Sequence, residues 1–244
     1  MARNTAYLYG KNSVCERLKA NPESIKRVCI QENFNSPQIL QLLAAAGITP
    51  KKVSEREISK LKRADRLQGI VAEVSRFQYT LFDELVADTE TRPSLIFLDN
   101  INDPHNLGSI IRITACLGGF GIVVPRHSSC EVNDTVMHVA SGGENFTPVS
   151  VVSNIPNALR KAKEAGYWIL GTVVDGGEDI REVSIPFPAC IVLGSEVAGI
   201  RHGVEKTLDK RITLPMQGAE LSLNVAMASA IFCYEIVRQR QKPT

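Results

Sequence analysis

Residues 95–112 read LIFLDNINDPHNLGSIIR: an apolar run, then a polar turn, then the start of a helical pattern. A short continuous apolar run bounded by turn residues is typical of a strand that is buried on both faces. The turn residues Asn102-Asp103-Pro104 favour a chain reversal before the helix. The stretch therefore predicts a buried strand whose carboxyl end leads through a polar loop into a helix.

The order of strand, loop and helix repeats along the rest of the chain. Further apolar runs predict strands at 122–124, 149–152, 169–174, 190–193 and 212–214. Helical spacing of apolar residues predicts helices over 107–117, 157–165, 204–208 and 224–239. Strands that alternate with helices indicate an α/β fold, with a parallel sheet covered by helices on both faces.

Ligands of parallel α/β sheets bind beyond the carboxyl ends of the strands. The loops after Leu98, Val174, Leu193 and Leu214 therefore form the candidate site. In the first of these loops, Asn106 is expected in the loop or at the helix cap, and Arg112 on the helix. A plain turn followed by a solvated arginine is the alternative interpretation.

The loops after the strands at 190–193 and 212–214 also carry unusual residues. Gly194 and Gly199 bracket Glu196 directly after an apolar run, which could also be only a strand-to-helix turn. The stretch 214–224 leads into a helix rich in small residues, with Ser222 or Asn224 as its N-cap. Here helix packing alone is the alternative interpretation.

The N-terminal part of the chain has its own α/β pattern. It predicts a helix start at 12–18, a strand at 27–30 and a closing strand at 70–74. A further helix should open at Ser36-Pro37 with a capping serine and end at Gly47, and Ser54 with Glu57 forms a capping box. We expect a small domain at 1–76, a linker with a short helical turn at 77–93, and a larger domain at 94–244.

Charge is divided unevenly between these parts. The 244-residue chain has a net charge of +2, but residues 1–76 carry 14 Lys and Arg against 7 Asp and Glu, a net of +7. The remaining residues have a net charge of −5. A basic N-terminal part suggests a polyanionic partner such as nucleic acid. An uneven partition of charge between two folded units, with no such partner, is the alternative.

Other features of the sequence favour a cytoplasmic protein without metal. No apolar run approaches the roughly 20 residues of a membrane helix, and the N-terminus leads into no signal-like apolar stretch. The six cysteines include no C-x-x-C pair and lie scattered in apolar segments, which indicates reduced, mostly buried thiols. No paired spacing relates the four histidines, so we expect no metal site.

Together, the three loops resemble the signature motifs of the SpoU/TrmH RNA 2′-O-ribose methyltransferases. The residues that carry the resemblance are Asn102-Asp103-Pro104-x-Asn106-x-Gly108 with Arg112, Leu193-Gly194-x-Glu196-x-x-Gly199, and Leu214-Pro215-Met216 with Ser222-Leu223-Asn224-Val225. In the N-terminal part, Tyr9-Gly10 and Gln68-Gly69-Ile70-Val71-Ala72 resemble the family's RNA-binding domain. The whole layout is similar to the family's group of large-subunit (23S) rRNA guanosine-2′-O-methyltransferases. The sequence departs from the family pattern at Ile113-Thr114, Leu67 and Glu220.

The resemblance implies a fold and a cofactor. It implies a C-terminal SPOUT-type α/β trefoil-knot domain, a smaller N-terminal α/β domain with a ribosomal-protein-like fold, and a homodimer. The cofactor would be S-adenosylmethionine, with S-adenosylhomocysteine as product and no metal. By matching position, the cofactor-binding residues would be Thr172, Gly194, Leu214, Ser222 and Leu223.

The resemblance also implies the catalytic residues, namely Asn106, Arg112, Glu196, Ser222 and Asn224. The family's mechanism assigns the activating role to Arg112. A guanidinium is a poor base, so we favour a phosphate clamp and alkoxide stabiliser, with a deprotonated arginine as the alternative. Glu196 would anchor one of the polar groups through a charge-assisted hydrogen bond.

The expected function is S-adenosylmethionine-dependent methylation of a ribose 2′-hydroxyl, on a guanosine in large-subunit rRNA. A tRNA ribose methyltransferase is one alternative, and an inactive RNA-binding or ribosome-assembly protein on the same scaffold is another. An unrelated nucleotide-binding enzyme would need a phosphate loop, and neither G-x-x-x-x-G-K-[ST] nor G-x-G-x-x-G in context is present.

Overall fold

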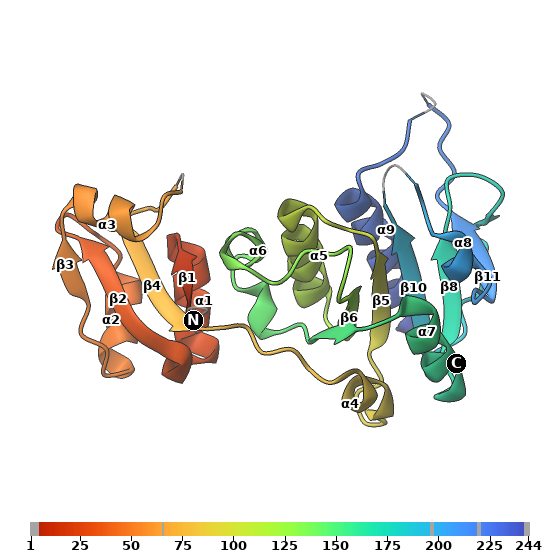
Figure 1. The fold of residues 1–244 in the computed structure, drawn as a ribbon, viewed down its shortest axis with the longest axis horizontal. Coiled ribbons are helices and arrows are strands. Elements are labelled where there is room, and N and C mark those ends of the chain that lie inside the picture. Colours follow the sequence, from red (N-terminus) through yellow and green to blue (C-terminus); the bar gives the residue numbers. More distant parts are fainter. Residues whose placement is uncertain (1–4, 65, 196–197, 219–220, 242–244) are drawn as a thin grey trace.

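The computed structural model describes residues 5–64, 66–195, 198–218 and 221–241. The described residues form two β-sheets, each with its own helices, which lie side by side and are joined by one crossing of the chain (Figure 1). The strands β1 to β4 and their helices are called the first unit, and the strands β5 to β11 with their helices the second unit. No helix in the described ranges is both long and apolar enough to cross a membrane.

The first unit is a sheet of order β1-β4-β2-β3, in which β2 and β3 pair in parallel and the other pairs are antiparallel. Helices α1 and α2 cover one face through buried residues such as Val14 and Leu43, and α3 covers the other through Ile58. The elements are β1 (Thr5–Tyr9), α1 (Lys11–Ala20), the 3-10 turn η1 (Pro22–Ser24), β2 (Ile25–Gln31), α2 (Pro37–Ala45), β3 (Lys51–Val53), α3 (Glu55–Leu61) and β4 (Ile70–Ser75).

Local sequence signals explain several of these boundaries. The capping box is confirmed: Ser54 Oγ accepts from the Glu57 amide at 3.3 Å, and the Ser54 amide donates to the Glu57 carboxylate at 2.9 Å. Pro37 opens α2, and Gly47, with a φ of +66°, follows its end. Ser36 stands at the N-cap, but its side chain makes no capping hydrogen bond, so that detail of the prediction is wrong.

The second unit has the parallel sheet that the sequence predicts, with the order β7-β6-β5-β10-β8-β11-β9. Strand β10 lies between β5 and β8, so segments almost one hundred residues apart in the chain pair directly. The elements are α4 (Phe82–Ala87), β5 (Ser94–Asp99), α5 (Pro104–Leu117), β6 (Phe120–Pro125), α6 (Asp134–Ala140), the 3-10 turn η2 (Gly143–Asn145), β7 (Val149–Val152), α7 (Ile155–Glu164), β8 (Trp168–Thr172), β9 (Glu178–Asp179), β10 (Ala189–Gly194), α8 (His202–Glu205), β11 (Lys210–Thr213) and α9 (Val225–Arg240).

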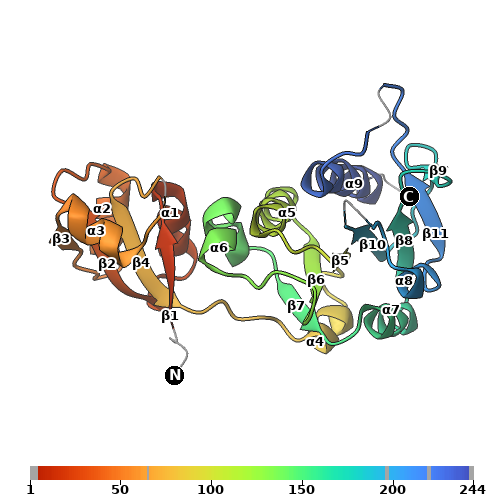
Figure 2. The ribbon, with the colours of Figure 1, turned by 45° about the horizontal axis from the view of Figure 1, so that its top comes forward.

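Alternate residues of each strand pack on opposite faces of this sheet. Ile96 and Leu98 share a core with α5 and α9, whereas Leu95 and Phe97 share another with α4, α7 and α8. Both faces are therefore buried, as the continuous apolar runs predict. Figure 2 shows α5 and α9 next to each other on one side of the sheet, with α4 and α7 on the other.

The structure differs from the expectations at a few elements. Helix α6 and the short strands β1, β3 and β9 were not predicted, and β8 ends at Thr172 rather than Val174. Asn106 lies within the first turn of α5, not in a loop or at the cap. The helix starts earlier because Asp103 is the N-cap, accepting from the His105 amide at 2.8 Å, and Pro104 takes the first helical position.

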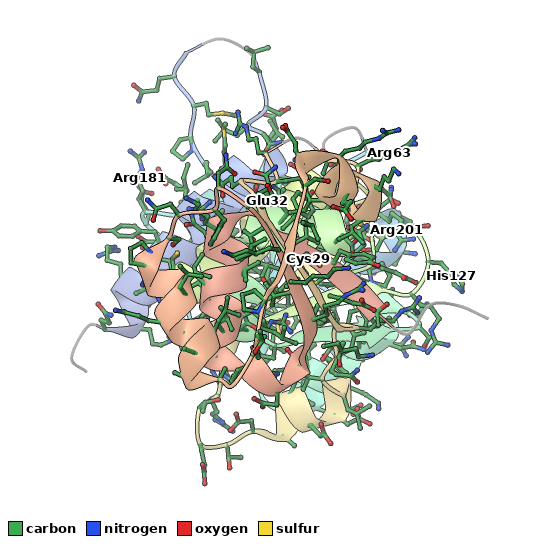
Figure 3. All side chains as sticks on the ribbon, turned by 90° about the vertical axis from the view of Figure 1, so that its left-hand side faces the viewer. Cys29, Glu32, Arg63, His127, Arg181 and Arg201 are labelled. Atoms are coloured by element: carbon green, nitrogen blue, oxygen red, sulfur yellow. The ribbon has the colours of Figure 1, made fainter. Side chains whose placement is uncertain are left out.

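The two units touch through α6 and η2, which lie against β1 and α1 (Figures 1 and 2). The Tyr9 and His138 rings stack with centroids 4.0 Å apart, and His138 Nδ1 hydrogen-bonds to the Tyr9 carbonyl at 2.9 Å. Asp134 pairs with Lys62 at 2.6 Å. Figure 3 looks from the side of the first unit and shows Arg63, next to this contact, pointing outward from the unit.

Candidate active site

A pocket of about 430 Å³ opens at the carboxyl ends of β8, β10 and β11, where a parallel α/β sheet is expected to bind its ligand. We call it the strand-end pocket. Its lining includes every residue that the resemblance suggests for cofactor contact: Thr172, Gly194, Leu214, Ser222 and Leu223. These residues come from three separate segments of the chain, which the fold gathers at one edge of the sheet.

The turn after β10 can form only because residue 194 is a glycine. A Cβ added to Gly194 would lie 2.2 Å from the Gly199 carbonyl carbon and 2.4 Å from the Ile200 nitrogen. Ser195 and Gly199 exchange backbone hydrogen bonds of 3.1 and 2.9 Å, and Gly199 has a φ of +63°. Ser195 and Gly199 are thus held side by side where both line the pocket. Glu196, a candidate catalytic residue, lies outside the described residues.

A buried carboxylate fixes the far end of this turn. Asp99, fully buried at the end of β5, accepts hydrogen bonds from the Arg201 amide at 2.9 Å and from Arg201 Nε at 2.8 Å. The Arg201 guanidinium, labelled in Figure 3, also pairs with Asp99 at 2.5 Å. The sequence did not assign this role to Asp99. The available signal was a carboxylate placed directly after a fully apolar strand.

The walls of the strand-end pocket combine apolar and charged side chains. Leu193, Leu223 and Phe232 supply apolar surface, while Asp175, Glu205 and Arg211 supply two carboxylates and one guanidinium, a net charge of −1. A small-molecule site of a few hundred Å³ typically combines apolar surface with a small number of polar and charged groups in this way. The pocket therefore suits a ligand that has a flat apolar part and a positive charge, and S-adenosylmethionine has both.

Two further candidate residues meet at the start of α9. Asn224 is the N-cap, and its Oδ1 accepts from the Ala226 amide at 2.9 Å. Its Nδ2 donates to Asn106 Oδ1 on α5 at 3.0 Å. The neighbouring residues Leu223 and Val225 line the strand-end pocket, so this amide pair lies beside the pocket.

Arg112 lies in a different place. It is exposed on α5, and its Nη1 donates to Ser141 Oγ at 3.4 Å. It lines a cleft of about 330 Å³ between the two units, and it is not among the residues that line the strand-end pocket. The described chain therefore brings the cofactor candidates, Asn106 and Asn224 together, but holds Arg112 apart from them. The described ranges contain no group of three or more His, Cys, Asp or Glu placed to hold a metal ion.

Comparison with known proteins identifies the family. Residues 93–234 match the family model described as "SpoU rRNA Methylase family", and residues 7–80 match "RNA 2'-O ribose methyltransferase substrate binding". The chain belongs to the SpoU rRNA methylase family. The resemblance inferred from the three loops is confirmed, and the matched ranges fall on the two units of the structure.

Relatives of this SpoU-family chain share almost its full length. The 23S rRNA (guanosine-2'-O-)-methyltransferase RlmB of Bordetella pertussis is 33% identical over 98% of this chain and 99% of its own. The RlmB of Ralstonia nicotianae is 32% identical over 96% and 95%. The crystal structure of an rRNA methyltransferase from Sinorhizobium meliloti, 24% identical, superimposes with a TM-score of 0.80 over 98% of this chain and 89% of its own. The likeness to that structure confirms the predicted α/β fold class.

Proposed function

We propose that this SpoU-family protein transfers a methyl group from S-adenosylmethionine to the ribose 2′-hydroxyl of a guanosine in large-subunit rRNA. The observation that carries the proposal is the strand-end pocket, whose lining unites Thr172, Gly194, Leu214, Ser222 and Leu223. The RlmB relatives, which share nearly the whole length, support rRNA and guanosine as the target.

The strand-end pocket fits the cofactor chemically. When bound, S-adenosylmethionine supplies an electrophilic methyl group. Leu193 and Leu223 would contact the adenine, and the tight turn after Gly194 would offer backbone groups at close range. With Asp175 and Glu205 against Arg211, the lining has a net charge of −1, which would favour the positively charged cofactor over its neutral product and so favour release after transfer.

Arg112 and the asparagine pair would act on the RNA. Holding a ribose oxygen in line for attack contributes on the order of 7–11 kcal/mol to such a reaction. Arg112 would clamp the adjacent phosphate and stabilise the alkoxide that develops as the 2′-hydroxyl loses its proton. Asn106 and Asn224, fixed by their mutual hydrogen bond, would orient the ribose near the cofactor.

A homodimer would resolve the separation between Arg112 and the strand-end pocket. Met227, Ile231 and Tyr234 form an apolar stripe on α9, with 64, 46 and 61% of their surface exposed. Their spacing places them on one side of the helix, and Ala228 and Phe232 of the same helix line the pocket. A second copy packed on this stripe would lie beside the pocket and would supply the partner's Arg112.

Complementation tests the homodimer. We expect Arg112→Ala and Gly194→Ala homodimers to be inactive, and mixed dimers to recover about a quarter to a half of the activity, because one of the two sites is intact. Recovery in the mixture supports a shared site. Activity of the isolated Met227→Glu monomer, measured by light scattering and methyl transfer together, would show that Arg112 acts within its own chain.

The first unit would hold the RNA. Residues 1–76 carry the net charge of +7, and lysine and arginine contacts to phosphate make binding strongly dependent on salt. We propose this segment as the RNA-binding domain, 77–93 as the linker and 94–244 as the catalytic domain.

The deciding experiment uses labelled S-adenosylmethionine with unmodified large-subunit rRNA and, separately, unmodified tRNA. The labelled nucleoside is then identified by mass spectrometry. Label on the ribose of guanosine from rRNA is the expected outcome. Ribose label in tRNA alone favours the tRNA enzyme, and label on a base contradicts ribose methylation. Cofactor binding without any transfer favours an inactive RNA-binding protein.

A further inference from the structure

The cleft that contains Arg112 is built by both units, and we call it the interunit cleft. It has a volume of about 330 Å³. Asn12 and Glu16 line it from α1 of the first unit, and Arg112 and Cys116 line it from α5 of the second unit. The remaining wall comes from the last residue of α6 and the segment that follows it, up to Phe146. These lining residues differ from those of the strand-end pocket, so the cleft can have its own role while the strand-end pocket holds the cofactor.

Two glycines bring the opposite walls of the interunit cleft close together. Gly142 has a φ of +95°, and a Cβ added there would lie 2.3 Å from Glu16 Cβ. A Cβ added at Gly143 would lie 3.1 Å from Arg112 Cα. These glycines thus let α1 approach on one side and α5 on the other. Glu16 and Arg112 consequently flank the same turn, one from each unit.

Phe146 gives the interunit cleft an aromatic surface. Its side chain is 59% exposed, and it lines the same cleft as a candidate catalytic arginine. Proteins that recognise unpaired nucleotides stack the bases on exposed aromatic rings. A ring beside a guanidinium can hold the base while the guanidinium contacts the ribose-phosphate.

Glu16 supplies a hydrogen-bond acceptor at the other wall. Its carboxylate pairs with Lys19 at 2.7 Å, but both side chains are substantially exposed, so this pair contributes little and can exchange for a ligand. A carboxylate repels phosphate and accepts two hydrogen bonds side by side. The Watson–Crick edge of guanine presents two adjacent donors, N1–H and the N2 amino group. Adenine presents an acceptor at N1, which a carboxylate disfavours.

We infer that the interunit cleft binds the base of the nucleotide to be methylated and that it selects guanine. Phe146 stacks on the base, Glu16 accepts from its Watson–Crick edge, and Arg112 is left beside its ribose. The inference rests on the proposed ribose methylation in a homodimer, where the partner's strand-end pocket would lie near Arg112, and it adds a residue from the first unit to target selection. A smaller adjoining cleft of about 230 Å³, which shares Asn12 and Glu16 and adds Lys11 and Lys19, is placed to take a neighbouring nucleotide.

Inosine provides the sharpest test of Glu16, because it is guanosine without the N2 amino group. Unmodified large-subunit rRNA is first methylated by the wild type, and the labelled position is mapped. A synthetic fragment is then made with guanosine or inosine at that position. We expect the wild type to methylate the guanosine fragment about 10- to 100-fold faster, as the loss of a charge-assisted hydrogen bond predicts. The Glu16→Gln variant should be slowed by a similar factor on guanosine and should barely distinguish the two fragments.

Controls separate recognition from folding. Glu23→Gln removes an exposed carboxylate elsewhere in the first unit and should leave the preference for guanosine unchanged. Binding of S-adenosylhomocysteine, measured by calorimetry, should be the same in Glu16→Gln and in the wild type because the strand-end pocket is separate. Phe146→Ala should raise the KM for RNA at least tenfold, and Phe146→Tyr should restore it.

Each outcome bears on the inference. A Glu16→Gln enzyme that keeps the full preference for guanosine over inosine overturns the role of Glu16. Wild-type ribose label on a nucleoside other than guanosine overturns guanine selection while ribose methylation stands. A wild type that places no label on any ribose overturns the proposed function and this inference together.

Discussion

A buried ion pair joins the two units, and its removal makes a quantitative prediction. Arg17 Nη2 of α1 pairs with Glu144 Oε1 of η2 at 3.2 Å, with 7 and 0% of the two side chains exposed. Arg17 also donates to Ser24 Oγ at 3.1 Å. We consider three variants: Arg17→Met, Glu144→Gln, and the two changes combined.

The expected cost follows from the burial of the pair. Removing one partner of a buried ion pair typically costs about 3–5 kcal/mol, because the other charge remains buried without its counter-charge. Since Ser24 still holds Arg17, we expect about 3 kcal/mol for Glu144→Gln, the lower end of that range. A cost of this size shifts the equilibrium constant between docked and separated units about 150-fold toward the separated state. The double variant should cost at most about 1 kcal/mol, since replacing both charges is often neutral.

The pH dependence provides a second signature. Burial raises the pKa of the Glu144 carboxyl above its ordinary value, although Arg17 acts in the opposite direction. A carboxyl with a raised folded-state pKa favours the folded state below its ordinary pKa, and that contribution is lost as the pH rises through the raised value. The pH dependence of stability should be larger in Arg17→Met, because the positive charge that opposes the rise in the pKa of Glu144 is removed. Mild acid should therefore restore stability to this variant. Glu144→Gln has no carboxyl to protonate and should not be rescued.

Urea unfolding and limited proteolysis measure these effects. Far-UV circular dichroism gives the unfolding free energy, and the rate of cleavage between residues 76 and 81 reports separation of the units. We expect the double variant to lose much less stability than the sum of the losses in the two single variants. Additive costs of the two single variants would refute the reasoning, as would an Arg17→Met protein that is no more stable at pH 5 than at pH 8.

Three further predictions concern other parts of the chain. Gly194→Ala should lower the free energy of unfolding by about 1–3 kcal/mol or more, because backbone atoms occupy the position of the added alanine side chain. Calorimetry should show no binding of S-adenosylmethionine to this variant. Normal binding would contradict the tight turn. Asn224→Ala should lose about 1 kcal/mol of stability in thermal unfolding, because α9 loses its N-cap. Asn224→Asp should keep the cap, but it cannot donate to Asn106 and should slow methyl transfer. Equal stability of the Asn224→Ala and Asn224→Asp proteins would contradict the capping role. Cys116 is exposed and should react with a thiol reagent in the native protein. Burial raises the pKa of Cys233 to about 12, so this thiol should react only after unfolding. Equal rates of reaction of the two thiols in the native protein would contradict this prediction.

Much of the fold could be predicted because its signals are local. Continuous apolar runs marked the buried strands, and Ser54 with Glu57 marked the start of α3. The elements that were missed depend on tertiary contacts. Strand β1 is held by pairing with β4, and the short α6 is stabilised by packing against α5 and the first unit. Their sequences carry little periodicity of their own.

The candidate site could be predicted in part for the same reason. Parallel strands end at one edge, so the loops after β10 and β11 had to meet, and the pocket is lined by both. The place of Arg112 could not be predicted in this way. It lies six residues beyond Asn106, less than two helical turns, and only the packing of η2 against α5 shows that it faces the first unit. The contact between Asp99 and Arg201 likewise joins residues 102 positions apart.

One short segment links the first unit to Arg112 in this fold. In residues 141–146, Ser141 contacts Arg112, Gly143 packs on the backbone of Arg112, and Glu144 pairs with Arg17 of the first unit. Within the described chain, Arg17 Nε and Glu144 Oε2 find no hydrogen-bond partner, so the pair is not optimised for stability alone. Its burial instead favours one arrangement of the units, the one in which Glu16 and Arg112 face the same cleft. A weakened ion pair should therefore reduce methyl transfer through misplacement of the first unit, even where the strand-end pocket still binds its cofactor.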